Sequence, residues 1–188
     1  TFVGGGEPTV RKGYEHIVEH ALDNDFLVSM VTNGSYLERL LSVNVETIRK
    51  ISWIGVDIDS GDPGLYEEIR RSRQSGLYEK VKNNIKELTS VGVTVDIKSL
   101  LFDKTINEES VISTLEYCKE VGARMVYFRL ALIDKSVIFN LDKEVETSIN
   151  EIAKKIGVKV KVNTSRMGER TYKKCHALYL IPVFSADG

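Results

Sequence analysis

Short apolar runs alternate with segments of helical periodicity along most of this chain. The apolar runs, which we predict to be strands, are residues 1–3, 26–31, 51–58, 93–102 and 124–132. The segments with apolar side chains on one helical face, or in short helical stretches, are residues 11–24, 45–50, 66–71, 78–91 and 108–121. Strands that alternate with helices pair in parallel, because each helix carries the chain back across the sheet. The sequence therefore predicts an α/β fold around a parallel sheet.

The rhythm is weaker after Ile133. Residues 141–156 predict one more helix and residues 158–163 one more strand, whereas residues 164–174 are polar and typical of a loop. We place a domain boundary there, because a domain boundary usually falls in an exposed polar stretch. The predicted domains are a core over residues 1–163 and the start of a smaller extension over residues 164–188.

Composition excludes several classes of protein. The 188 residues carry a formal net charge of −1, so no basic surface indicates a nucleic-acid partner. No apolar stretch is long enough to span a bilayer, and two cysteines do not form the disulfide framework of a secreted domain. We expect a cytoplasmic location. The chain starts with Thr1 inside a strand and stops in a turn at Asp187-Gly188, so we expect it to be an internal piece of a longer protein.

Polar residues fall at or near the carboxyl end of each predicted strand. Those residues are Gly5, Gly6 and Glu7, then Thr32 and Asn33, then Asp57 and Asp59, then Lys98, and then Arg129. The carboxyl ends of parallel strands meet at one edge, where ligands bind. Glycines let a ligand approach the backbone, Glu7 is an acceptor that suits an ammonium group, and Pro8 ends the strand. Such a set favours a ligand with both positive and negative parts.

These motifs, in this order, resemble the radical S-adenosylmethionine superfamily. The resemblance rests on Gly5-Gly6-Glu7-Pro8, on Thr32-Asn33-Gly34, and on Val56-Asp57-Ile58-Asp59 followed by residues 66–70, and it covers about residues 1–132. It implies a partial (β/α) barrel. It also implies reductive cleavage of S-adenosylmethionine by a [4Fe–4S] cluster, which gives an adenosyl radical that abstracts a substrate hydrogen. An electron donor such as flavodoxin or ferredoxin would then be a partner.

The resemblance also implies roles for individual residues. Gly5, Gly6 and Glu7 would hold the methionyl ammonium, and Arg70 would pair with the methionyl carboxylate. Asp57 would lie near that carboxylate or the ribose. The remaining strand-end residues, namely Pro8, Thr32, Asn33, Asp59, Lys98 and Arg129, would complete the cofactor site.

Two cysteines bear on the metal chemistry. The family's three-cysteine motif lies upstream of the glycine-rich strand, and Cys118 and Cys175 do not replace it, so this chain alone is not expected to hold the catalytic cluster. The tail from Cys175 to Gly188 resembles the SPASM or twitch extension, in which Cys175 would bind an auxiliary cluster and the substrate would be a peptide or protein. A plain core cysteine is the alternative for Cys175, and Cys118 fits a buried, inert thiol.

Other interpretations remain open at this stage. Lys98 interrupts an apolar strand, which also fits a βα-barrel lyase or isomerase with a Schiff-base lysine. A binding domain that kept only the fold is a further alternative. Asp59 is also a candidate cap for the following turn, and Arg129 requires a partner, which is either a substrate or a carboxylate. Ser35 with Glu38 predicts a capping box for the next helix.

Overall fold

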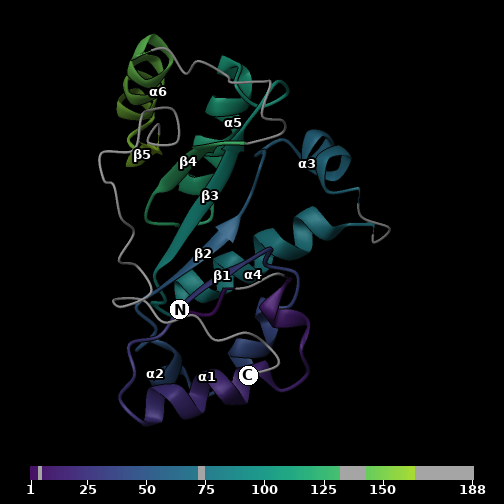
Figure 1. The fold of residues 1–188 in the computed structure, drawn as a ribbon, viewed down its shortest axis with the longest axis vertical. Helices are drawn as coiled ribbons and strands as arrows, with labels where there is room; N and C mark the ends of the chain where they lie inside the picture. Colours follow the sequence, from purple (N-terminus) through teal and green to yellow (C-terminus); the bar gives the residue numbers. More distant parts are fainter. Residues whose placement is uncertain (4–5, 72–74, 132–142, 164–188) are drawn as a thin grey trace, which may run out of the picture.

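A parallel sheet of five strands forms the centre of the protein (Figure 1). The computed structural model describes residues 1–3, 6–71, 75–131 and 143–163. The strands follow one another in space in the order of the sequence, and every neighbouring pair is parallel. They are β1 (Ser29–Thr32), β2 (Trp53–Asp57), β3 (Val95–Leu101), β4 (Val126–Leu130) and β5 (Val160–Asn163). The sheet is open, which agrees with the predicted partial barrel.

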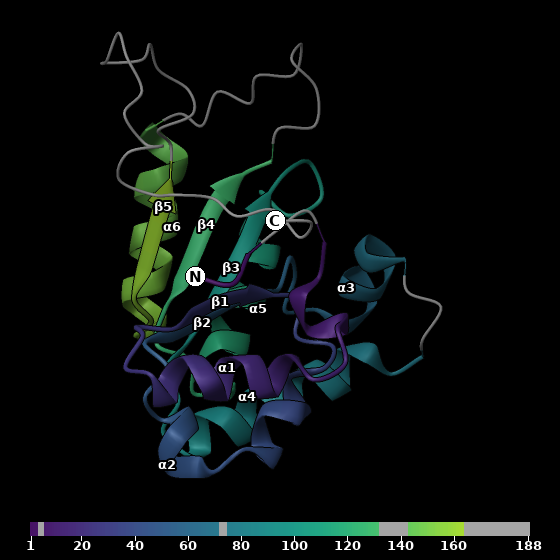
Figure 2. The same cartoon turned by 60° about the horizontal axis from the view of Figure 1, so that its bottom comes forward.

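Helices cover one face of this sheet. Figure 2 shows α1, α2 and α4 grouped on one side of the strands. The α-helices are α1 (Tyr14–Asp23), α2 (Val45–Ile48), α3 (Pro63–Arg70), α4 (Leu77–Ser90), α5 (Glu108–Glu120) and α6 (Lys143–Ile156), and two 3₁₀ helices are η1 (Pro8–Val10) and η2 (Leu37–Ser42). Strand side chains that face the helices, such as Ile54, Ile97 and Phe128, are buried in the core. Their neighbours Lys98 and Arg129 point to the other face, because successive strand residues alternate.

The predicted alternation of strands and helices is confirmed through residue 163. Both β5 and α6 come from the region where the sequence rhythm is weak, and β5 pairs with β4 through Val126 and Val160. Beyond β1, Phe2 forms a parallel bridge to Met30. Its N–H donates to the Ser29 carbonyl at 2.7 Å, so the segment before the glycines extends the sheet.

The predicted strand over residues 26–31 is wrong in its first half. Strand β1 begins only at Ser29, and the side chains of Phe26 and Leu27 are 68% and 89% exposed. The Phe26 N–H donates to the Ala21 carbonyl at 3.0 Å, and Asp25 has a φ of 60°. Asp25 and Phe26 therefore close the end of α1, as in a helix-terminating αL turn, and the Phe26 N–H is not available to a strand ladder.

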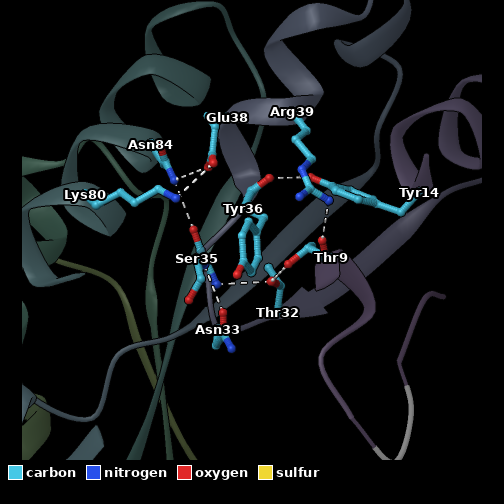
Figure 3. A network of polar contacts seen from close by, with 11 residues as sticks. Thr9, Tyr14, Thr32, Asn33, Ser35, Tyr36, Glu38, Arg39, Lys80 and Asn84 are labelled. Carbon is cyan, nitrogen blue, oxygen red and sulfur yellow. Dashed lines mark hydrogen bonds and ion pairs between the residues drawn. The ribbon is translucent and has the colours of Figure 1, made fainter. Parts of the chain in front are cut away.

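The predicted capping box is also wrong. The helix after Ser35 is the 3₁₀ helix η2, and its first turn receives no side-chain cap. Glu38 instead reaches α4, where it accepts a hydrogen bond from Asn84 at 3.0 Å and pairs with Lys80 at 2.9 Å (Figure 3). A tertiary contact has displaced the local one.

Several sequence predictions fall outside the described residues. These are Gly5, Cys175 and the predicted extension over residues 164–188, together with the start of the helix predicted from residue 141. No helix in the described part of the chain is long and apolar enough to cross a membrane.

Candidate functional site

The carboxylate of Glu7 fastens the first segment of the chain to the end of β1. Its Oε1 accepts hydrogen bonds from the Thr9 N–H at 2.9 Å and from the Thr9 and Thr32 hydroxyls at 2.6 Å each. Its Oε2 accepts one from the Asn33 N–H at 2.6 Å. A carboxylate offers about four acceptor positions, so most of this capacity is used inside the chain.

Hydrogen bonds to Thr32 and to α4 fix the loop that follows β1 (Figure 3). The Thr32 hydroxyl accepts from the Gly34 N–H at 3.0 Å, and Asn84 on α4 donates to the Gly34 carbonyl at 3.1 Å. Gly34 has a φ of +82°, and a Cβ there would lie 2.8 Å from the Val81 side chain. Only glycine fits this turn, which therefore sets the position of the loop that carries Asn33.

A cavity of about 270 Å³ lies beside these groups. Residues from the first segment, from the end of β1 and from the end of β2 line it together. They are Val3, Gly6, Glu7, Pro8, Val31, Thr32, Asn33 and Asp57. We call it the glycine-side cavity. Its polar lining is dominated by the carboxylates of Glu7 and Asp57, which are hydrogen-bond acceptors.

Arg70, at the end of α3, folds back over the end of β2. It donates to the Asp57 carbonyl oxygen and lies 3.4 Å from the Asp59 carboxylate. The Asp59 carboxylate also accepts from the Leu100 N–H at 3.3 Å, which ties β2 to β3. The side chains of Arg70 and Asp59 are only 21% and 11% exposed, so each ion compensates for the burial of the other.

Asp57 is the least supported carboxylate at this edge. Burial is the largest influence on the pKa of Asp57 and raises it. The positive charges of Arg70 and Lys98 oppose that rise, and the negative charges of Asp59 and Glu7 add to it. Within the described residues, no donor bonds to its side chain. A half-buried acid with a raised pKa and no donor among the described residues is a common feature of ligand sites.

A second cavity of about 300 Å³ adjoins the first and shares Val31 and Asp57 with it. It continues along the strand ends toward β4, and we call it the arginine-side cavity. Its lining residues are Val31, Asp57, Asp59, Arg70, Lys98, Ser99, Leu100 and Arg129. The Nε of Arg70 is buried and lacks a hydrogen-bond partner among the described groups.

The two cavities bring together the strand-end residues that the sequence singled out, apart from Gly5, which is not described. Thr32 is the one whose side chain is turned away, because it is 1% exposed and bonded to Glu7. Asp59 does not cap the next helix: Asp62 does, by accepting from the Leu65 N–H at 2.7 Å. Contact of any of these residues with a ligand stays a prediction.

Sequence reasoning missed the side chains that complete the open face of the sheet. Leu100 lies in the arginine-side cavity, and Trp53 and Tyr127 lie in a third cavity. The signal for them was the strand period of two: Leu100 follows Lys98 by two residues, and Tyr127 precedes Arg129 by two.

The described residues do not fit an iron–sulfur cluster. Among them no group of three or more His, Cys, Asp or Glu side chains is placed to bind a metal ion. Cys118 is buried in α5, and burial raises the pKa of its thiol to about 12, so it stays protonated. The prediction that Cys118 is buried is confirmed.

The chain belongs to the radical SAM superfamily. The sequence profile of that family matches residues 1–118. This range contains every lining residue of the two cavities except Arg129. The predicted family and the α/β fold are confirmed. A family profile of this kind favours the radical enzyme over the lysine-dependent lyase and over the binding domain.

Curated relatives include enzymes of two named activities. A S-adenosylmethionine-dependent nucleotide dehydratase of Selenomonas ruminantium is 30% identical over 97 residues, which cover 50% of this chain and 35% of the relative. A probable GTP 3′,8-cyclase of Methanocella arvoryzae is 30% identical over 117 residues, which cover 61% of this chain and 36% of the relative. The chain thus spans about a third of the length of these relatives.

Solved structures share the fold. Streptococcus suis SuiB bound to S-adenosylmethionine has a TM-score of 0.64 at 15% identity, over 95% of this chain and 38% of that protein. A domain of a pyruvate-formate lyase-activating enzyme from Bacteroides vulgatus has a TM-score of 0.65 at 13% identity, over 85% of this chain and 96% of that domain.

Proposed function

We propose that this protein binds S-adenosylmethionine across the two adjoining cavities, as part of a radical S-adenosylmethionine enzyme. The observation that carries the proposal is the uneven distribution of charge along the edge. The charged residues of the glycine-side cavity are carboxylates alone, whereas Arg70, Lys98 and Arg129 line the arginine-side cavity beside Asp57 and Asp59. The methionyl end of the cofactor carries an ammonium and a carboxylate on one carbon. A cavity with carboxylates alone that adjoins a cavity with cations suits such a pair.

The residues then take separate roles. The ammonium lies against the Gly6 backbone and the Glu7 Oε2, which accepts only one hydrogen bond inside the described chain. The Arg70 guanidinium is the donor for the carboxylate. Asp57, which lines both cavities, accepts from the ribose hydroxyls, and it avoids the carboxylate because two like charges repel. Pro8, Asn33, Asp59, Lys98 and Arg129 complete the walls.

Reductive cleavage of S-adenosylmethionine is the general reaction of the family, and hydrogen abstraction by the adenosyl radical is the activity that we propose for the whole protein. The residues described do not fit the [4Fe–4S] cluster that would supply the electron. We further propose the extension over residues 164–188, with Cys175 as a ligand of an auxiliary cluster, a flavodoxin or ferredoxin as electron donor, and a cytoplasmic location.

The substrate class has two candidates. One is a peptide or protein, which is supported by the SuiB fold neighbour, whose structure is known with its precursor peptide SuiA. The other is a small molecule, which is supported by the curated relatives that act on nucleotides.

Calorimetric titration of S-adenosylmethionine into the intact, anaerobically reconstituted protein tests the cofactor site. Glu7→Gln removes the charge and keeps the shape, and a charge-assisted hydrogen bond is worth roughly 1.5–3 kcal/mol, so affinity should fall about tenfold to a hundredfold. Glu151→Gln, the same change on the exposed side of α6, is the matched control and should bind as wild type does.

A second variant guards against misfolding, because Glu7 also holds the loop after β1. Asp57→Asn disturbs no hydrogen bond within the described chain and should still weaken binding by about threefold to tenfold. If folded Glu7→Gln and Asp57→Asn both bind S-adenosylmethionine as tightly as wild type, the proposed site is wrong.

A further inference from the structure

The face of the sheet that turns away from the helices carries a third cavity of about 370 Å³. It lies toward the start of the strands, since Trp53 begins β2 and Met125 precedes β4. Its lining residues are Trp53, Asp96, Lys98, Met125, Tyr127, Arg129 and Lys161. It shares Lys98 and Arg129 with the arginine-side cavity, and we call it the aromatic cavity. Nothing in the proposed cofactor site uses its aromatic walls.

Strand register builds one row of these side chains across the sheet. Lys98 is paired with Tyr127, and Tyr127 with Lys161, so a cation, a ring and a cation follow one another on β3, β4 and β5. The Lys161 Nζ lies 5.6 Å from the centre of the Tyr127 ring. Side chains that are directly opposite on neighbouring strands are within reach of each other, so the row is a property of the pairing.

A glycine in β2 makes room for this arrangement. A Cβ on Gly55 would lie 2.7 Å from the Lys98 Cδ and 2.9 Å from the Trp53 ring. Because that Cβ is absent, the aliphatic part of Lys98 lies against β2. Its Nζ then lies 5.9 Å from the centres of both the Trp53 and the Tyr127 rings.

Within the described residues, the cations that line the aromatic cavity form no ion pair with a carboxylate. Its one carboxylate, Asp96, is occupied by Arg124, with hydrogen bonds of 2.8 Å and 2.6 Å to its two oxygens. No carboxylate of the described chain forms an ion pair with Lys98, Arg129 or Lys161. Three cations that form no ion pair within the described residues favour an anion, and the Trp53 and Tyr127 rings beside them give the same cavity apolar walls for a flat group.

We infer that the aromatic cavity binds an anion that carries a planar aromatic ring, with a nucleoside phosphate as the model of its chemistry. The ring lies against Trp53 and Tyr127, and the acidic groups meet Lys98, Arg129 and Lys161. The volume falls in the usual range for a small-molecule site. The inference goes beyond the proposed cofactor site and does not depend on it, because S-adenosylmethionine is held at the strand ends.

The chain provides its own reporter for this cavity. Trp53 is the single tryptophan in the sequence, so its fluorescence reports from the aromatic cavity. We would titrate the intact protein with GTP in the absence of S-adenosylmethionine, at low salt and with inner-filter correction. Saturable quenching is expected, and it should weaken as ionic strength rises because charge drives binding. Guanosine lacks the phosphates and inorganic triphosphate lacks the ring, so each should bind at least about tenfold more weakly than GTP.

Lys161→Gln is the variant of choice, because Lys161 is exposed and its loss should not disturb folding. We expect the dissociation constant for GTP to rise about threefold to tenfold. Lys154→Gln, on α6 at the other face of the sheet, makes the same change in net charge and should have no effect.

Three results would overturn the inference. They are an unchanged Trp53 signal at millimolar GTP, equal affinity for guanosine or triphosphate, and equal losses in the Lys161 and Lys154 variants. Because the titration contains no S-adenosylmethionine, none of these results bears on the proposed cofactor site.

Discussion

Two halves of the same sheet edge use their polar residues differently. Around Glu7, the carboxylate accepts four hydrogen bonds from Thr9, Thr32 and Asn33. Around Asp57, one carboxylate has no donor among the described residues, and the Nε of Arg70 has no acceptor there. The Glu7 carboxylate uses most of its acceptor capacity inside the chain, whereas the Asp57 carboxylate uses none of it among the described residues.

This difference separates polar groups that stabilise the fold from polar groups that are free to bind a ligand. Buried polar groups that are satisfied by their own chain hold a backbone shape, and removing one leaves its partners unpaired. A buried polar group without a partner carries a cost that a ligand can relieve. The comparison therefore predicts that similar polar changes on neighbouring strand ends will differ in size and even in sign.

The largest effect should come from Arg70, the anchor of the second half. Arg70→Met leaves Asp59 as a charge that is 11% exposed and unpaired, and it removes the donor to the Asp57 carbonyl. We expect the free energy of unfolding to fall by about 3 kcal/mol, measured by urea denaturation. Arg71→Met, one residue further and exposed, is the control; an equal loss in both variants would mean that the Asp59 pair contributes nothing.

A smaller loss should follow from Thr32→Val in the first half. The hydroxyl donates to Glu7 and accepts from the Gly34 N–H, so its removal leaves a buried donor and part of a carboxylate unsatisfied. The expected loss in free energy of unfolding is about 1–3 kcal/mol by the same measurement. Thr47→Val on α2, whose hydroxyl makes no such bonds, should change it by about 0.5 kcal/mol or less. A neutral Thr32→Val would remove the basis for calling this half self-supporting.

The smallest effect should have the opposite sign. Burial raises the pKa of Asp57, so the folded state holds its proton more tightly than the unfolded chain, whose Asp has a pKa of about 3.9. The wild type therefore loses stability as pH rises from about 3.9 through the raised folded pKa. Asp57→Asn carries no such titration.

Thermal unfolding of both proteins at about pH 4 and about pH 7 measures this difference. The variant should gain in melting temperature relative to wild type at the higher pH and show little difference at the lower. A variant that is less stable at about pH 7 would show that the Asp57 charge is supported in the fold, and the contrast between the two halves would then fail.

The order of elements in this protein follows from its sequence alone. Local periodicity sets helices such as α4 and α5, because a one-faced pattern is useful only when that face is buried. The parallel order of the strands also brings Glu7, Asn33 and Asp57 to one edge, because the carboxyl ends of parallel strands lie together. The motifs at that edge were enough to identify the family.

Tertiary structure decided what each of these side chains does. Phe26 and Leu27 are typical strand residues, yet the Phe26 N–H bonds to the end of α1 and both side chains are exposed. Glu38 fits a local cap, yet it pairs across to α4. The conformations and partners of these residues depend on tertiary contacts, which local helix and strand propensities do not describe.

The row of Lys98, Tyr127 and Lys161 shows the same limit at the level of the sheet. Each residue is compatible with a strand by itself. Which ring meets which cation is set by register, and a slip of one residue would turn a side chain to the opposite face. The sequence by itself therefore determined which residues reach the open face and the strand ends. Only the packed sheet decided which of them are neighbours, because that choice depends on how separate strands align.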